Sequence, residues 1–321
     1  MSVIPVLAIH GGAGAVNRDR STPEKEREYE QALQDVLLTG QKALTQGASA
    51  LDVVEQAVRD LEDCPLFNAG KGSVYTSEGT HELDASIMDG STLKAGAVAQ
   101  LRHVRNPIRA ARAVMDAGQY VFLAGASADE FARACGLDMV DQEYFGTPER
   151  LAQLHEVQRV GGMHLVLDHD AADMMRDDPI VSSNKFGTVG AVACDVHGNL
   201  AAANSTGGMT NKRPGRVGDS AVIGAGCYAD NATAAVATTG TGETFIRGAV
   251  AYDVCALMRY RGLSLEDAAR LVIMDKQPTL GGLGGLVAVD AQGNVTMPFN
   301  TAGMYRGSIH ADGRLHVAIY R

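Results

Sequence analysis

The first third of the chain alternates between apolar runs and helical periods. Apolar residues fill positions 3–9 and predict a core strand, after which the glycine-rich segment 10–14 (HGGAG) predicts a tight turn. Positions 21–47 carry a cap, a first-turn proline and a closing glycine, and positions 49–63 place their apolar residues on one face. Two helices are therefore expected after the first strand.

The middle of the chain predicts shorter elements and then loses its periodicity. Strands are expected at 83–89, 94–101 and about 120–124, with helices at 107–117 and 127–135. From about 137 to 187 no period is sustained, which predicts a mobile linker.

The last third is rich in strands. Apolar runs at 188–194 and 200–205 flank DVHGN, and runs at 286–289 and 295–299 flank DAQGN, so two hairpins are expected. Helical patterns at about 242–261 and 264–276 separate them. Strands in groups and helices in pairs favour stacked antiparallel sheets covered by helices, an α+β fold.

Composition narrows the functional classes. A net charge of -10 spread along the chain argues against a nucleic-acid groove, and no run of about 18 apolar residues predicts a membrane span. Five cysteines without C-x-x-C spacing suggest reduced thiols of a cytoplasmic protein, and residues 1–8 resemble a strand and not a signal peptide. A small-molecule partner is expected, with no nucleic acid and no membrane.

Several common catalytic motifs are missing. The HGGAG segment lacks the spacing of a phosphate loop, and the chain has no G-x-S-x-G or H-E-x-x-H sequence. An acidic cluster in the linker lacks a rigid scaffold, so we do not expect it to bind metal; its members are His164, Asp168, His169, Asp170 and Asp173.

Thr188 stands directly after the linker, at the start of a strand. A threonine there is usually only a strand residue, but an eleven-residue hairpin would return Ser205 and Thr206 to its side. A threonine hydroxyl needs a base, and the α-amino group of an N-terminal threonine, with a pKa of about 7.7 to 8.0, can serve. This chemistry requires cleavage between Gly187 and Thr188.

Three further residue groups fit the same acyl-transfer site. Thr239 and the N–H of Gly240 would form an oxyanion hole. Arg216 suits a carboxylate and Asp219 an ammonium, although a plain salt bridge between the two is the alternative. Together they predict recognition of a zwitterionic amino acid.

Read together, these motifs resemble the plant-type asparaginase family, also called isoaspartyl peptidases. The likeness covers nearly the whole chain outside the linker, through HGGAG (10–14), CPLFNAG (64–70), ELDA (82–85), GTVGAV (187–192), STGG (205–208), GRVGDS (215–220) and TGTGE (239–243).

The resemblance implies an N-terminal-nucleophile hydrolase with an αββα four-layer sandwich. It implies self-cleavage into an α subunit (1–187) and a β subunit (188–321), paired as a dimer of heterodimers, and hydrolysis of the β-amide of asparagine and of β-aspartyl dipeptides. The implied nucleophile is Thr188, contacted by Thr206, with an oxyanion hole at Thr239 and Gly240. The implied substrate-binding residues are Arg216, Asp219, Gly240 and Gly242.

The resemblance implies no catalytic cofactor but a structural Na⁺ bound by backbone carbonyls of Leu61, Glu62, Cys64, Phe67, Ala69 and Lys71. Two positions depart from the family pattern: Asn204 replaces a usual threonine, and Lys71 replaces a usual apolar residue. Two rival functions stay open, a glycosylasparaginase of the same fold and an amino-acid or nucleotide-binding protein that uses the HGGAG turn.

Overall fold

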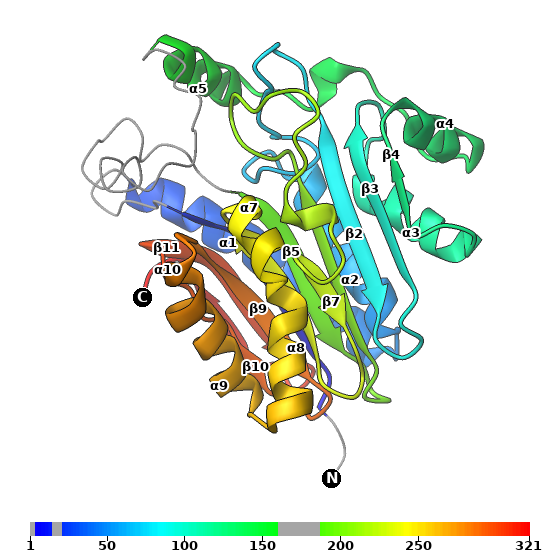
Figure 1. Ribbon diagram of the computed structural model, residues 1–321, viewed down its shortest axis with the longest axis vertical. Coiled ribbons are helices and arrows are strands. Elements are labelled where there is room, and N and C mark those ends of the chain that lie inside the picture. The colour runs from blue at the N-terminus through cyan, green and yellow to red at the C-terminus, as the bar shows by residue number, and fades with distance from the viewer. Residues whose placement is uncertain (1–3, 15–20, 160–186) are drawn as a thin grey trace.

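The computed structural model describes residues 4–14, 21–159 and 187–321. Their strands form two sheets (Figure 1). The eight-stranded sheet has the order β12-β11-β1-β5-β6-β2-β3-β4, and the four-stranded sheet the order β10-β9-β8-β7. The strands are β1 Val6–Gly14, β2 Leu83–Asp89, β3 Ala95–Leu101, β4 Phe122–Ala124, β5 Thr188–Cys194, β6 Leu200–Thr206, β7 Cys227–Ala229, β8 Ala234–Gly240, β9 Gly284–Asp290, β10 Val295–Thr296, β11 Gly303–His310 and β12 Leu315–Ala318.

Helices cover the outer faces of these sheets (Figure 1). Helices α1 (Pro23–Thr45), α2 (Ala50–Asp63) and α3 (Pro107–Ala117) pack on the large sheet, whereas α8 (Val250–Arg261) and α9 (Leu265–Arg270) pack on the small one. An apolar cluster fills the space between the two sheets, where β5 packs against β8 and β9. The predicted mixed helix-and-sheet fold is confirmed.

Helix starts follow the sequence signals. The Thr22 hydroxyl accepts a hydrogen bond from the N–H of Lys25 at the start of α1, and the Ser49 hydroxyl accepts one from Asp52 at the start of α2. Helix α3 ends at Gly118, whose φ of 70° is easiest for glycine. These local signals explain why the predicted boundaries lie within a few residues of the observed ones.

The predicted turn at residues 10–14 is wrong. The segment is the second half of strand β1, which pairs with β11 on one side and β5 on the other, with a bulge between His10 and Gly12. Its glycines serve close packing, because a Cβ atom on Gly11 would lie 2.3 Å from the Phe67 ring.

The first part of the predicted linker is folded. Residues 137–159 contain a 3-10 turn (Gln142–Tyr144) and helix α5 (Pro148–Arg159), after helix α4 (Ala126–Ala134). Phe145 is fully buried and its carbonyl accepts a hydrogen bond from Gly72, which fixes the segment to the core. Phe145 is a single buried aromatic residue in a segment without apolar periodicity, so the sequence pattern does not reveal that the segment is folded. Residues 160–186, with the acidic cluster, lie outside the described residues.

The two late helices are more broken than predicted. Ala249, with φ of 47°, separates α7 (Gly242–Gly248) from α8, and a π-helical segment (Leu271–Lys276) joins α9 to α10 (Gln277–Thr279). Among the described residues, no helix combines the length and apolar character that a membrane crossing requires.

Candidate functional site

Thr188 begins strand β5 and lies directly opposite Thr206 of β6. The expected return of the hairpin is therefore present, and both side chains are buried, with 6% and 3% exposed. The Thr206 hydroxyl donates a hydrogen bond to the carbonyl oxygen of Gly187 at 3.3 Å and accepts one from the N–H of Gly208 at 2.9 Å. Thr206 thus touches the acyl side of the Gly187–Thr188 bond.

The Thr188 hydroxyl has a partner that the sequence reasoning missed. Its Oγ1 lies 3.1 Å from Oγ of Ser220, a buried residue in the turn Asp219–Ala221. The Ser220 backbone is itself fixed, because the Ser86 hydroxyl donates to its carbonyl oxygen at 2.5 Å. Ser220 therefore holds the Thr188 hydroxyl from a segment 32 residues away in sequence.

His10 contacts the backbone of Thr188 and not its hydroxyl. Nδ1 of His10 lies 3.0 Å from the Thr188 carbonyl oxygen, and since a carbonyl only accepts, Nδ1 carries the proton. Burial lowers the pKa of His10 to about 4, partly offset by this hydrogen bond. A neutral imidazole committed to a carbonyl positions the strand and does not act as the missing base.

Asn204 bridges the two sheets behind the nucleophile. Its Nδ2 donates to the carbonyl oxygens of Gly226 at 2.6 Å and Thr238 at 3.1 Å, which joins β6 to the small sheet. A threonine hydroxyl, with one donor, cannot make both bonds. Asn204 therefore ties β6 to the small sheet at two points.

Thr239 and Gly240 end strand β8, next to the nucleophile strand. Gly240 lines the same hollow as Thr188, and a Cβ atom there would lie 2.3 Å from the Leu283 carbonyl oxygen, so only glycine fits. The Thr239 hydroxyl is fully buried and accepts a hydrogen bond from the N–H of Ala13 at 3.3 Å.

Arg216 and Asp219 line that hollow together with Thr188. Nε and Nη2 of Arg216 form a bidentate pair with Glu243, at 2.9 and 3.0 Å. The pair occupies one edge of the guanidinium group, which leaves its Nη1 side for a second carboxylate. Glu243 is a site residue that the sequence reasoning did not single out, although it lies at the end of TGTGE.

Asp219 is an unusual carboxyl group. Burial raises its pKa to about 6, while a hydrogen bond from Thr238 at 2.9 Å and the charge of Arg216 act in the opposite direction. Gly242 lies against both charged side chains, because a Cβ atom on it would be 2.8 Å from Nη2 of Arg216 and 3.1 Å from Oδ1 of Asp219. The site thus presents a cation, an anion and a hydroxyl around one hollow.

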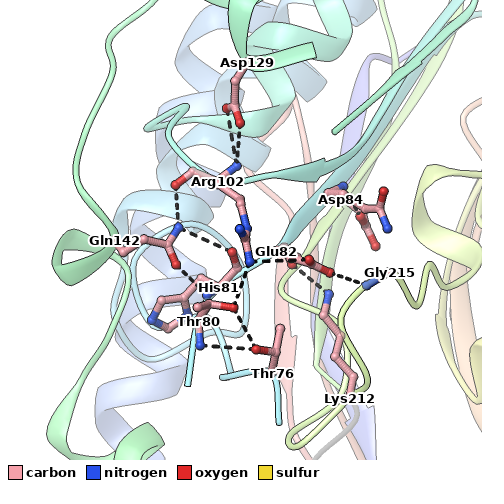
Figure 2. Close-up of polar contacts among 11 residues, drawn as sticks. Thr76, Thr80, His81, Glu82, Asp84, Arg102, Asp129, Gln142, Lys212 and Gly215 are labelled. Atoms are coloured by element: carbon pink, nitrogen blue, oxygen red, sulfur yellow. Dashed lines mark hydrogen bonds and ion pairs between the residues drawn. The ribbon is translucent and has the colours of Figure 1, made fainter. Parts of the chain in front are cut away.

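A buried polar network fixes the segment that carries Arg216 (Figure 2). The Lys212 ammonium donates to the Glu82 carbonyl oxygen at 2.8 Å, and the Glu82 carboxylate accepts from the N–H of Gly215 at 2.8 Å. Arg102 lies 3.8 Å from that carboxylate. The backbone next to Arg216 is therefore bonded to Glu82, the first residue of the ELDA motif, just before β2.

The loop 61–71 has the donors that a hard cation requires. Carbonyl oxygens of Phe67, Ala69 and Lys71 accept no hydrogen bond from any residue that the structure describes, and those of Leu61, Glu62 and Cys64 accept one each. The Lys71 ammonium lies 5.9 Å from the centre of the Tyr144 ring, an arrangement that favours a cation–π contact. Backbone oxygens without a hydrogen bond are the kind of donor that a hard cation takes. Within the described ranges no group of three His, Cys, Asp or Glu side chains gathers to hold a metal.

Comparison with known proteins finds relatives that match almost the whole chain. A family model described as asparaginase matches residues 3–319. The chain is 56% identical to the isoaspartyl peptidase of Salmonella typhimurium, covering 98% of both chains, and 55% identical to that of Escherichia coli, covering 98% of this chain and 96% of the relative. It is 40% identical to the isoaspartyl peptidase/L-asparaginase of Bos taurus, covering 98% and 96%. The chain therefore belongs to the asparaginase family.

Proposed function

We propose that this protein is a self-activating amidohydrolase that cleaves the β-amide of asparagine and of N-terminal β-aspartyl dipeptides. One observation carries the proposal: the Thr188 hydroxyl shares a hollow with the cation of Arg216 and the anion of Asp219. Relatives named isoaspartyl peptidase in bacteria and isoaspartyl peptidase/L-asparaginase in animals support the same substrates.

Activation begins with attack of the Thr188 hydroxyl on the Gly187 carbonyl carbon. The hydrogen bond from Thr206 to that carbonyl oxygen polarises the group and stabilises the negative charge that develops on it. The amide nitrogen takes up the proton that the hydroxyl loses and leaves as the acyl group shifts to oxygen, and water then hydrolyses the resulting ester. The products are an α subunit (1–187) and a β subunit (188–321) whose first residue is Thr188.

The new α-amino group then serves as the base. It takes the hydroxyl proton as Thr188 Oγ1 attacks the substrate's β-carbonyl carbon, and the oxyanion is stabilised by the N–H of Gly240 and the Thr239 hydroxyl. The resulting ammonium gives its proton to the leaving nitrogen. Water releases aspartate from the acyl-enzyme by the reverse sequence of proton transfers.

Recognition of the head group explains the choice of bond. Arg216 binds the α-carboxylate and Asp219 the α-ammonium, with Gly240 and Gly242 allowing close approach, so the side-chain carbonyl faces Thr188. An α-linked aspartyl dipeptide has its α-carboxylate in the peptide bond and loses this contact. Glutamine is one methylene longer, and misplacement on the order of 1 Å costs about a hundredfold.

We propose the assembly of the family for this chain as well. The two packed sheets with outer helices support an αββα four-layer sandwich, and the cut protein would pair as a dimer of heterodimers. The loop 61–71 would hold a structural Na⁺ that takes no part in catalysis. The five cysteines are free, the usual state in a reducing compartment, so a cytoplasmic location stays a prediction.

A denaturing gel with amino-terminal sequencing tests the proposal. The expected result is two fragments, with Thr188 as the new amino terminus, formed by a first-order process whose rate does not depend on protein concentration. Ammonia release from asparagine and amino acid release from β-aspartyl-leucine should follow processing. One intact band together with protection by nucleotides would instead support the binding-protein alternative.

A further inference from the structure

Gly187 lines two hollows, and only one of them contains the head-group residues. Both hollows are small and partly open to solvent. The walls of the second are residues 11–14 of β1, the aromatic side chains of Tyr29, Phe67 and Tyr305, and the polar side chains of Asn68 and Arg150. Neither the proposed chemistry nor the family likeness has used this second hollow.

The aromatic side chains form a compact wall. The rings of Tyr29 and Tyr305 stack with centroids 4.3 Å apart, and Phe67 packs edge-on to Tyr29 at 5.7 Å. All three are at most 8% exposed, so they present fixed surfaces to whatever enters. Such a wall is suited to an apolar side chain.

Arg150 adds a positive charge to this wall. Its Nε donates to the Gly72 carbonyl oxygen at 2.7 Å and its Nη1 lies 3.3 Å from the Gln153 side-chain oxygen, which together hold the guanidinium in place. Among the described residues, its hydrogen-bond partners are these two neutral oxygens and no carboxylate. Burial lowers the pKa of Arg150, and the charge of the neighbouring Glu149 offsets this only in part.

The chemistry requires the leaving group to pass Gly187. In the cut enzyme the α-amino group of Thr188 gives its proton to the leaving nitrogen, so these two nitrogens must lie within hydrogen-bond distance. The space beside the Thr188 nitrogen is the space that Gly187 fills before cleavage. A leaving group in this space extends into the second hollow, which Gly187 also lines, and not toward Arg216 and Asp219.

From this geometry we infer that the second hollow is the subsite for the leaving amino acid of a β-aspartyl dipeptide. Arg150 binds the free α-carboxylate of that residue, and the wall of Tyr29, Phe67 and Tyr305 receives its side chain. The inference rests on the proposed function and adds its leaving-group preference. Ammonia released from asparagine does not reach Arg150.

Three substrates and two arginine variants test this subsite. The substrates are asparagine, β-aspartyl-leucine and the C-terminal carboxamide of β-aspartyl-leucine. Arg150→Gln should lower kcat/KM for β-aspartyl-leucine by about 10- to 100-fold, the loss expected for one charge-assisted contact, and leave asparagine within about twofold. Arg159→Gln, at an exposed arginine of the same helix, should leave all three within about twofold.

The carboxamide separates a binding role from a structural one. Wild-type enzyme should cleave it about 10- to 100-fold less efficiently than the free acid, and Arg150→Gln should abolish that difference. Equal rates for acid and amide in the wild-type enzyme would overturn the subsite even if the variant fails to fold, and so would an equal loss on asparagine and dipeptide. If the wild-type enzyme cleaves neither asparagine nor β-aspartyl-leucine, the proposed function itself fails.

Discussion

The pair of Arg216 with Glu243 offers the sharpest test of the head-group site. Arg216→Met removes the cation that would bind the substrate carboxylate and leaves the Glu243 carboxylate, which Arg216 pairs with beside the hollow, without its partner. Removing one partner of a charged pair in a binding site costs about 2 to 5 kcal/mol. That range corresponds to a loss in kcat/KM for asparagine of about 30- to 5,000-fold.

The structure places the expected loss in the upper part of this range. The Arg216 side chain is 18% exposed and that of Glu243 33%, so solvent screens the pair only in part. The abandoned carboxylate would repel the substrate's carboxylate as well. Glu243→Gln alone keeps the cation but loosens its orientation, and we expect a smaller loss of about tenfold, seen mainly in KM.

A double-mutant cycle measured by ammonia release gives the coupling directly. Arg216→Met with Glu243→Gln should be less impaired than the sum of the single losses by about 0.5 to 3 kcal/mol, because the repulsion disappears with the charge. Arg314→Met, at an exposed arginine paired with Asp312, is the control and should be silent. Additive losses in the cycle, or an Arg216→Met enzyme within threefold of wild type, would refute the reasoning.

Four further predictions concern the nucleophile, its neighbours and the cation loop. Thr188→Ala should abolish both processing and hydrolysis, whereas Thr188→Ser should keep some of each, as gels and ammonia release will show; near-normal activity of the alanine variant would exclude Thr188 as nucleophile. Ser220→Ala should lower kcat by about two- to twelvefold, the worth of one neutral hydrogen bond, and an unchanged kcat would make that contact irrelevant. Because the pKa of Asp219 is raised to about 6, it loses its charge below that pH and cannot pair with the substrate ammonium. Protonation of the Thr188 α-amino group alone gives log kcat/KM a slope of one against pH, and protonation of Asp219 should steepen the slope to two below pH 6. Asp219→Asn should keep the slope of one. Exchange of Na⁺ for tetramethylammonium should lower Tm by about 4 °C if Na⁺ was at 100 times its Kd, and identical melting curves would show that loop 61–71 binds no Na⁺.

The hairpin from Thr188 to Thr206 was predictable because strand geometry and a turn signal act over a few residues. Arg216 and Asp219 also stood out, since their charges in a glycine-rich loop are chemically conspicuous. Ser220 and His10 were not assigned contacts with Thr188, because each reaches it only through the packing of distant strands. No local pattern encodes such a contact.

The errors have the same origin. Segment 10–14 was predicted as a turn because glycine usually signals one, yet here Gly11 makes room for the Phe67 ring against a central strand. Residues 137–159 were assigned to the linker because helix α5 buries little beyond Leu154 and so shows no apolar stripe. Both elements depend on contacts with residues far away in the sequence, and such contacts leave no trace in the local pattern of apolar residues.

The strand order of the large sheet has a consequence for the proposed cut between Gly187 and Thr188. Strand β1 belongs to the amino-terminal piece but lies between β11 and β5 of the carboxy-terminal piece, while β6 of the latter lies beside β2 of the former. The two pieces are thus woven into one sheet, and separating them would break three strand ladders and expose the core. Cleavage of this one bond should therefore be irreversible and yet leave the fold almost unchanged, and neither piece should fold if it is synthesised alone.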